Sequence, residues 1–333
     1  MKKIDEETLS SLAGAACGAL CVSLAVIALQ AAAQDYPSRV VRFIVPQTPG
    51  GATDVFARAV GQRLAERWGK SVIVENRAGA AGTLGTDVVA KSPPDGYTLL
   101  VTYAGSQAIN QSLYAKLPFD SVKDFQTVAT LAVTPFFLIV NNGVPVKNVQ
   151  ELIALAKRKP ELLTYASSGN GSVNHLLAEM LKIDAGIRML HVPYKGIAPA
   201  ITDVMAGQVD AAFTSVPSVI QHVAGGRVRA IAVSSARRVA IAPDVPAIAE
   251  SGLRGFDVNP WWGVLAPAGI DTRIVRKINA DAADVLKMKE MQDFFKGQGA
   301  EALITTPEEF YKMLVADVAK WAKVVKASGA RID

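Results

Sequence analysis

The chain has 333 residues, a formal net charge of +5, 50% hydrophobic residues and 20% charged residues. Its basic residues are scattered rather than interleaved with aromatic ones, which argues against nucleic-acid binding. Because the whole chain holds three histidines and two cysteines, the sequence predicts neither a metal site nor a cofactor, and its length favours two domains.

Residues 1–33 have the pattern of a secretory signal peptide. A short basic start precedes an apolar, Ala-rich run over 12–29, and small residues end the segment at Ala33. We expect cleavage after Ala33 and a periplasmic protein. An uncleaved membrane anchor is the alternative, because the run is just long enough to span a bilayer. Both cysteines lie in this segment, so the exported chain would carry no disulfide.

From Val40 onward, short apolar runs alternate with helical periodicities, which is typical of an α/β protein with largely parallel sheets. The first series predicts strands at 40–46, 71–76 and 97–104, with helices at 52–69 and 82–92 between them. The apolar stretch 128–141 is too long for an edge strand. It predicts one strand that leaves the first domain and enters the second.

A second α/β series follows, and a Pro- and Gly-bounded stretch at 256–269 is predicted to carry the chain back. The predicted helices are 149–159, 172–183, 199–207 and 218–226, and the predicted strands are 162–168, 188–194, 209–216 and 228–234. Helices at 272–295 and 307–328 end the chain. Two crossings predict two α/β domains around a cleft: domain 1 of residues 34–135 and 258–333, and domain 2 of residues 136–257.

Four loops rich in Gly, Ser and Thr follow predicted strands, at 46–54, 76–85, 166–175 and 193–200. Ligands of open α/β sheets bind beyond the carboxyl ends of the strands, and glycines before a helix let its N–H groups approach an anion. The loop at 76–85 lacks the Lys-Ser/Thr pair of a phosphate loop, which argues against nucleotide phosphate. Asp54 is expected to cap a helix rather than to contact an anion directly.

A hydrolase acting through Ser172 and His175 is a second class of function. The two residues are three apart at a predicted helix start, but the sequence shows no G-x-S-x-G elbow and no acid placed to orient a histidine. The sequence therefore favours a binding protein over an enzyme.

Six motifs occur in order along the chain: "PGGATD", "ENRAGAAGTLG", "SPPDGYTLL", "YASSGNGSVNH", "HVPYKGIAPAITDVMAGQVDAAF" and "WWGVLAPAG". Together they resemble those of the substrate-binding proteins of tripartite tricarboxylate transporters, a group expanded in Bordetella. The resemblance implies an α/β type II periplasmic-binding-protein fold, with two domains joined by two crossing segments around a ligand cleft.

The resemblance also implies capture of a small carboxylate by domain closure and delivery to membrane permease subunits, by a monomer. The ligand classes left open are di- and tricarboxylates, acidic amino acids and aromatic carboxylates, and a co-receptor for a membrane sensor kinase is the alternative role. Asp210 would bind an amino group of the ligand, if the ligand has one. The implied ligand-binding residues are Thr48, Gly50, Gly51, Asp54, Gly82, Ser106, Ser167, Gly169, Gly171, Ser172, His175, Tyr194, Gly196 and Asp210.

The chain departs from the family pattern at four positions. Gln47 stands where an apolar or aromatic residue is usual, Ala78 replaces a proline, and Ala81 replaces a glycine. Asp271 replaces a proline at a helix start. Because three of these positions lie in the proposed cleft loops, we expect Gln47 above all to bear on ligand specificity.

Overall fold

The computed structural model describes residues 36–160 and 162–331. The signal peptide expected at 1–33 lies outside the described residues. The described residues divide into a first unit that ends at Arg39 and a second unit that begins at Val40. No helix among the described residues combines the length and the apolar character needed to cross a membrane.

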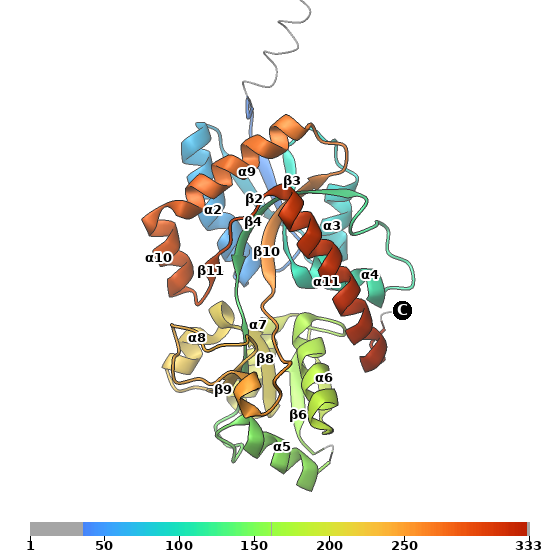
Figure 1. The fold of residues 1–333 in the computed structure, drawn as a ribbon, viewed down its shortest axis with the longest axis vertical. Coiled ribbons are helices and arrows are strands. Elements are labelled where there is room, and N and C mark those ends of the chain that lie inside the picture. Colours follow the sequence, from blue (N-terminus) through green and yellow to red (C-terminus); the bar gives the residue numbers. More distant parts are fainter. Residues whose placement is uncertain (1–35, 161, 332–333) are drawn as a thin grey trace, which may run out of the picture. The chain divides into compact units, whose positions relative to one another are not determined.

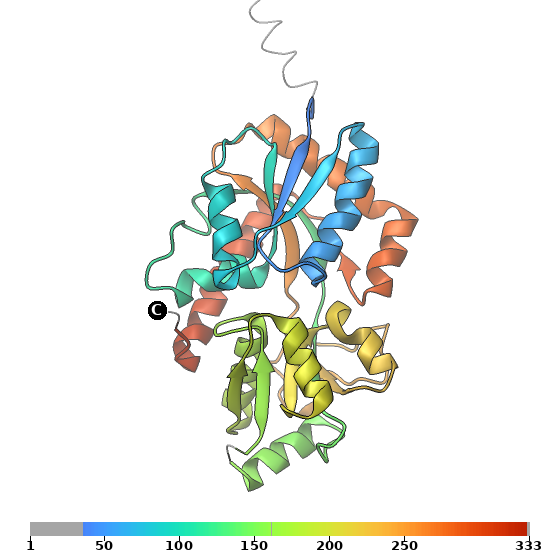
Figure 2. The same cartoon turned by 180° about the vertical axis from the view of Figure 1, so that it is seen from behind.

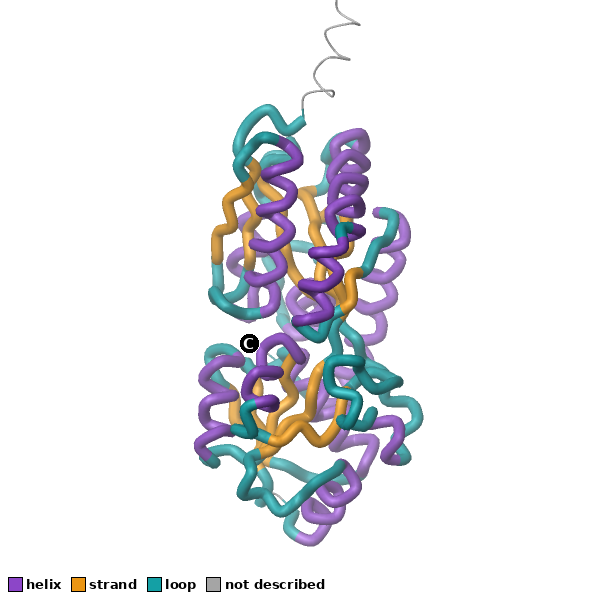
Figure 3. The backbone as a smooth tube through the Cα atoms, turned by 90° about the vertical axis from the view of Figure 1, so that its left-hand side faces the viewer, coloured by secondary structure: helices purple, strands orange, loops and turns teal. Residues whose placement is uncertain are grey.

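The second unit is built on two sheets, each with helices on both sides (Figures 1 and 3). The first has the strand order β11-β4-β10-β3-β1-β2, and we call this sheet and its helices the first lobe. Its elements are β1 (Val41–Val45), α2 (Ala52–Trp68), β2 (Val72–Asn76), α3 (Thr83–Ala90), β3 (Thr98–Tyr103), α4 (Asn110–Leu113), β4 (Phe125–Val133), β10 (Trp261–Pro267), α9 (Thr272–Lys287), α10 (Lys289–Gly297), β11 (Glu301–Ala302) and α11 (Pro307–Ser328).

The second sheet has the order β7-β6-β8-β5-β9, and with its helices it forms the second lobe (Figure 2). Its elements are β5 (Phe136–Val140), α5 (Val149–Arg158), β6 (Thr164–Ser167), α6 (Val173–Ala185), β7 (Leu190–Pro193), α7 (Ile197–Ala206), β8 (Ala211–Ser215), α8 (Val216–Ala224) and β9 (Arg229–Val233). Three short helical turns complete the unit: Ala80–Gly82, the π-helical Gly105–Ile109 and Ile248–Ser251.

Two expectations from the sequence need correction. The stretch 128–141 is not one strand but two, since β4 ends at Val133 and β5 begins at Phe136, in different sheets. Pro135 lies between them and has no N–H to continue a ladder. The sheets are also mixed rather than largely parallel: β1 and β6 have parallel neighbours, whereas β5 and β10 pair with theirs antiparallel.

The two segments that cross between the sheets lie side by side. The N–H of Thr134 donates to the carbonyl of Pro260 at 3.2 Å. The Ser234 hydroxyl accepts from the N–H of Phe136 at 2.8 Å and donates to the carbonyl of Val258 at 2.6 Å. Thr134 and Ser234 are fully buried, so no water competes for these bonds. The crossings therefore form one hydrogen-bonded hinge.

Helix limits follow local sequence signals. The helical stretch predicted at 272–295 is divided at Met288 into α9 and α10. The Asp271 side chain caps α9 by accepting the N–H of Arg273 at 2.8 Å, so this departure from the family pattern keeps a helix start. Thr306 and Glu309 form a capping box at the start of α11.

In the core of the first lobe, aromatic rings pack closely against strand β10 at Gly263, which has no side chain. A Cβ there would lie 2.5 Å from Cζ of Phe310 and 3.0 Å from the carbonyl oxygen of Ala129. Phe310 also packs edge-on against Trp261, with ring centroids 4.7 Å apart. The β10 backbone therefore depends on this glycine for its close approach to α11.

Gly263→Ala should destabilise the protein by about 1–3 kcal/mol, because the added methyl group overpacks a closed core. Urea unfolding followed by circular dichroism measures the change. Gly297→Ala is the matched control, since a Cβ at Gly297 meets nothing within 4 Å. Equal stability of the two variants would contradict the prediction.

Candidate functional site

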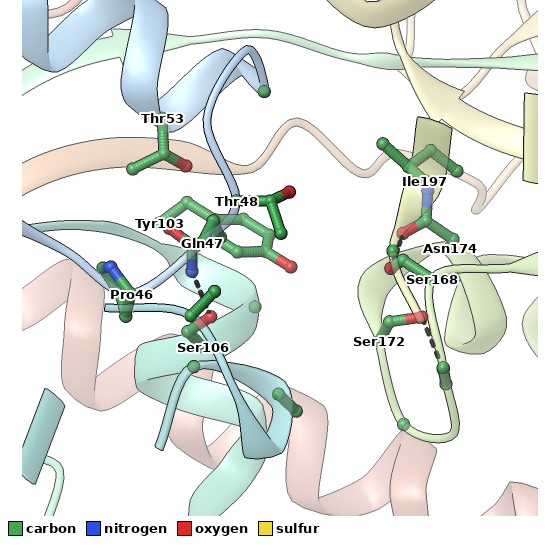
Figure 4. A pocket seen from close by; sticks show the side chains of 18 of the residues that line it. Pro46, Gln47, Thr48, Thr53, Tyr103, Ser106, Ser168, Ser172, Asn174 and Ile197 are labelled. Atoms are coloured by element: carbon green, nitrogen blue, oxygen red, sulfur yellow. Dashed lines mark hydrogen bonds between the residues drawn. The ribbon is translucent and has the colours of Figure 1, made fainter. Parts of the chain in front are cut away.

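A cavity of about 810 Å³ lies between the loops of the two lobes. Figure 4 shows residues of the first lobe facing those of the second across it. The lining residues are Pro46, Gln47, Thr48, Gly51, Ala52, Thr53, Ala78, Gly79, Ala80, Ala81, Gly82, Tyr103, Gly105, Ser106, Asn110, Tyr114, Phe136, Ser168, Gly169, Asn170, Gly171, Ser172, Asn174, Tyr194, Lys195, Gly196, Ile197, Ser215, Ser218, Trp262 and Arg331.

Four helices begin at this cavity. The first residues of α2, α6, α7 and α8 follow the carboxyl ends of β1, β6, β7 and β8, and residues at each of these starts line the cavity. The residues that precede α2, α7 and α8, which are Gly51, Gly196 and Ser215, give no side-chain cap to their helices. The first turns of α2 and α7 therefore have no side-chain cap that competes with a ligand, whereas in α8 the Val216 N–H donates to the carbonyl of Pro135 at 3.2 Å and residue 217 is a proline. The helix dipoles give this region a positive potential.

The charged side chains that line the cavity are positive, as are the N-terminal ends of the helices. Among the lining residues, which all belong to the described part of the chain, Lys195 and Arg331 are the charged ones, and none is an Asp or Glu. The remaining polar groups are hydroxyls and amides, which hydrogen-bond an anion without opposing its charge. The cavity is therefore suited to an anionic ligand.

The first-lobe wall holds a hydrogen-bonded pair of polar side chains and a stacked pair of aromatic rings. Gln47 Nε2 donates to the Ser106 hydroxyl at 2.7 Å, and Ser106 also hydrogen-bonds Tyr103 (Figure 4). Tyr103 stacks on Trp262 with centroids 5.5 Å apart, and burial raises the pKa of Tyr103 to about 12. The Trp262 indole N–H donates to the Thr53 hydroxyl at 3.0 Å, which fixes this ring at the start of α2.

The adjoining segment before α3 is held in an unusual backbone conformation. Ala80 and Ala81 have positive φ angles of 46° and 53°, in the left-handed region that favours glycine. The Asn110 amide donates to the carbonyl of Ala81 at 3.0 Å, and the Tyr114 hydroxyl donates to that of Ala80 at 2.8 Å. These bonds from α4 and the residue after it stabilise the segment along the cavity.

On the second-lobe wall, Asn174 is anchored by the sheet. Its amide donates to the carbonyl of Phe213 in β8 at 2.7 Å, and its Oδ1 accepts the Ser168 hydroxyl at 2.7 Å. Nearby, the hydroxyls of Ser215 and Ser218 are 2.8 Å apart. The Tyr194 hydroxyl donates to Asp203 at 2.6 Å, and burial together with this bond raises the pKa of Tyr194 to about 12. All these side chains stay uncharged at neutral pH.

Ser172 and His175 do not form a nucleophile and base. The Ser172 hydroxyl donates to the carbonyl of Gly169 at 2.7 Å and accepts the His175 backbone N–H, as a helix cap does. His175 is not among the lining residues: its Nδ1 accepts the N–H of Gly171 at 2.9 Å, and its ring stacks on that of His191 with centroids 4.0 Å apart. Burial lowers the pKa of both histidines, that of His191 to about 3. The hydrolase alternative therefore lacks its geometry.

The structure brings most of the predicted ligand-binding residues to one cavity. Those that line it are Thr48, Gly51, Gly82, Ser106, Gly169, Gly171, Ser172, Tyr194 and Gly196. They come from both lobes and from all four of the loops selected in the sequence.

Five predicted residues lie outside the lining: Gly50, Asp54, Ser167, His175 and Asp210. Gly50 donates its N–H to Asp54 at 3.0 Å, and Asp54 also accepts from Asn76 and pairs with Arg58. Burial opposes ionisation of Asp54, but its partners Arg58, Gly50 and Asn76 outweigh this and lower its pKa. Gly50 and Asp54 thus order the loop from outside the lining. Asp54 lies in the first turn of α2, whose N-cap is Gly51 without a side-chain cap, so Asp54 is a first-turn acid and the expected cap role is not found.

Ser167 and Asp210 support the second sheet. The Ser167 hydroxyl lies 2.7 Å from Nε2 of His191. Asp210 precedes β8 and accepts both the N–H and the hydroxyl of Thr164 at 2.8 Å, at the amino end of β6. This end is opposite to the carboxyl end where Ser167 leads to the cavity loop. Asp210 is therefore not placed to bind an amino group of a ligand in the cavity.

Several lining residues are not among those expected from the sequence. Ser215 and Ser218 follow β8, so the rule on carboxyl strand ends that identified the other loops applies to them as well. Asn110 and Tyr114 lie at α4, in a stretch without a distinctive pattern. Arg331 follows the last helix, where no strand-end signal exists.

The comparisons with known proteins agree with this geometry. Residues 56–330 match the model of the tripartite tricarboxylate transporter family receptor. Protein BugT of Bordetella pertussis is 36% identical over 312 residues, which cover 93% of this chain and 96% of BugT.

Two solved structures of similar proteins carry ligands. R. palustris Rpa4515 with adipate has a TM-score of 0.85 and 35% identity, covering 89% of this chain and 99% of the other. MatC from Rhodopseudomonas palustris with bound malate has a TM-score of 0.81 and 31% identity, covering 87% of this chain and 100% of the other.

Two lobes, two crossings and a cleft of helix starts define a type II periplasmic-binding-protein fold, the fold of a solute receptor. The chain belongs to the tripartite tricarboxylate transporter receptor family. It is a periplasmic solute-binding protein and not an enzyme.

The left-handed conformation at Ala81 gives a stability prediction. Ala81→Gly should stabilise the protein by about 1 kcal/mol, because glycine adopts a φ of 53° without the Cβ penalty. Thermal unfolding of the two proteins measures the difference. Ala90→Gly, in the regular helix α3, is the control and should instead destabilise by up to about 1 kcal/mol. A lower stability of Ala81→Gly than of the unaltered protein would contradict backbone strain at residue 81.

Proposed function

We propose that this receptor captures a small carboxylate in the cavity by closing its two lobes and delivers it to the membrane subunits of a tripartite transporter. The observation that carries the proposal is the convergence of four helix starts on a cavity whose charged lining residues are both cations. A buried carboxylate is stable only where its oxygens are hydrogen-bonded, and helix N-termini supply such donors without loss of side-chain entropy.

The relatives support carboxylate as the ligand class. Adipate and malate, bound by two structural neighbours, are both dicarboxylates, although malate alone carries a hydroxyl group. Within the proposed site, the nine predicted residues that line the cavity supply backbone and hydroxyl donors, and Gln47 positions Ser106. Because Gln47 is a departure from the family pattern, it would adjust the choice among carboxylates.

The proposal includes the domain limits and the route of export. Domain 1 would consist of residues 34–135 and 258–333 and domain 2 of residues 136–257, so that both boundaries fall in the hydrogen-bonded crossings. Cleavage after Ala33 would release the receptor into the periplasm as a monomer. The carboxylate would be held by donors from both domains, which makes closure depend on the ligand.

A thermal-shift screen of carboxylates tests the proposal. A ligand that binds the folded state at 100 times its Kd adds about 2.7 kcal/mol, which raises the Tm of a chain of this size by a few degrees. We expect at least one dicarboxylate to give this shift, and isothermal titration to confirm binding. Uncharged sugars of similar size are the control. A shift by sugars and by no carboxylate would refute the proposed function.

Closure itself can be tested where the lobes meet. Gly171, before α6 in the second lobe, has a φ of +70°, and a Cβ on it would overlap the Leu113 side chain of α4 in the first lobe. The two lobes can approach here only because residue 171 has no side chain. Gly171→Ala should therefore weaken carboxylate binding at least tenfold, about 1.4 kcal/mol, measured by titration calorimetry.

Two further variants separate closure from backbone strain. Gly186→Ala, at the other end of α6, has a similar φ of +60° and nothing within 4 Å of its Cβ, so it should bind as the unaltered protein does. Adding Leu113→Ala to Gly171→Ala removes the overlapping atoms and should restore part of the affinity. Full affinity in Gly171→Ala alone would contradict this account of closure.

A further inference from the structure

The segment after α11 brings a positive charge to the cavity. Helix α11 ends at Ser328, and Gly329 turns the chain through the left-handed region with φ 68° and ψ 9°. The Ser328 hydroxyl donates to the carbonyl of Val325 at 3.0 Å and accepts the N–H of Ala330 at 3.3 Å. This turn directs the following residue, Arg331, to the cavity that the loops of both lobes line.

Arg331 has no counter-ion among the residues that the structure describes. Some arginines form ion pairs, such as Arg42, 2.7 Å from Glu75, and Arg238, 2.7 Å from Glu250. Others on the surface form none within the described residues, so what distinguishes Arg331 is its place in the cavity lining. The lining of the cavity offers Arg331 no carboxylate, and the other cation there, Lys195, likewise has no ion pair within the described residues. An anionic group of a ligand is the counter-charge that this site lacks.

Helix α11 joins the two lobes mechanically at this point. It packs against β4, α4 and the turn Gly105–Ile109 of the first lobe, and against α6 of the second. In Figure 1 its end lies beside α4 and near the upper end of α6. A residue that follows this end is therefore well placed against the ligand when both lobes approach it, so its contact would form on closure.

Arginine suits the recognition of a second anionic group better than the neutral wall does. The helix starts and hydroxyls of the cleft can satisfy one carboxylate, whereas the planar guanidinium binds a further carboxylate through two parallel hydrogen bonds. A volume of about 810 Å³ leaves room for a ligand with groups at two ends.

We propose that Arg331 is a specificity-determining residue, which binds a second anionic group of the ligand and makes the receptor select dianions over monoanions. This inference rests on the proposed carboxylate binding and goes beyond it, since it assigns a ligand contact to the segment after the last helix. Loss of one charge-assisted contact should lower affinity about 10- to 100-fold.

The test uses the α,ω-dicarboxylates from succinate to suberate, each paired with its monomethyl ester, which keeps chain length and one carboxylate. Titration calorimetry gives Kd for the purified protein, for Arg331→Gln and for Lys326→Gln. Lys326→Gln removes the same charge from the exposed last turn of α11, outside the lining, and so controls for net charge. Arg331 is exposed, so its replacement leaves the core unaltered.

We expect the unaltered protein to prefer the best diacid over its monoester at least tenfold, and Arg331→Gln to lose most of this preference while its affinity for the monoester stays the same. Lys326→Gln should keep the preference. Equal binding of diacid and monoester, or an unchanged preference in Arg331→Gln, overturns the inference and leaves carboxylate binding intact. Failure of every carboxylate to bind overturns the proposed function and this inference together.

Discussion

The hydrogen bonds between the two crossing segments set the limits on how the lobes can move. Thr134 is bonded to Pro260, and Ser234 links Phe136 to Val258, and these residues are all buried. Two linkers bonded side by side favour bending of the lobes about the line that joins them over twisting and sliding, which two separate linkers would permit. In the proposed function, ligand capture is this single bending motion, and the loops at the carboxyl ends of both sheets are carried towards each other by it.

An anion in the cleft must be satisfied by both lobes. The start of α2 belongs to the first lobe and those of α6, α7 and α8 to the second, so neither lobe alone surrounds a carboxylate with donors. Residues outside the lining hold these loops in place. Asp54 orders the loop before α2, and the buried His175 accepts the N–H of Gly171. Preorganised loops reduce the entropy that ligand binding must overcome. Several motif residues do not line the cavity because they hold other residues of the loops and sheets in place.

The alternation of apolar runs and helical periodicities predicted most elements, because those periods follow from burial on one or two faces. The apolar pattern alone did not divide 128–141 into two strands, since both halves are buried and equally apolar; the signal for the break was Pro135, which cannot continue a strand ladder. The rule that ligands bind beyond the carboxyl ends of strands predicted the cavity loops correctly. The same rule would have excluded Asp210 from the ligand-binding residues, because Asp210 lies before its strand. His175 shares a motif with true lining residues, but whether a ring turns outward or inward is decided by packing on His191 and Tyr165, which are distant in the chain. Arg331 has no local pattern at all, because only the path of α11 brings it to the cleft.

The stacked rings of Tyr103 and Trp262 also make the site optically distinct. The chain has four tryptophans, all of them in the described residues, and Trp262 alone is part of the cavity lining. The indole of Trp262 is buried against Phe56 and tied to Thr53, whereas Trp68, Trp261 and Trp321 lie elsewhere in the first lobe. Indole emission depends on the polarity and the charges around the ring, so an anion that replaces water beside Trp262 alters one emitter out of four. In the proposed function, Trp262 would therefore report ligand binding through its fluorescence, from the cavity wall at the start of α2.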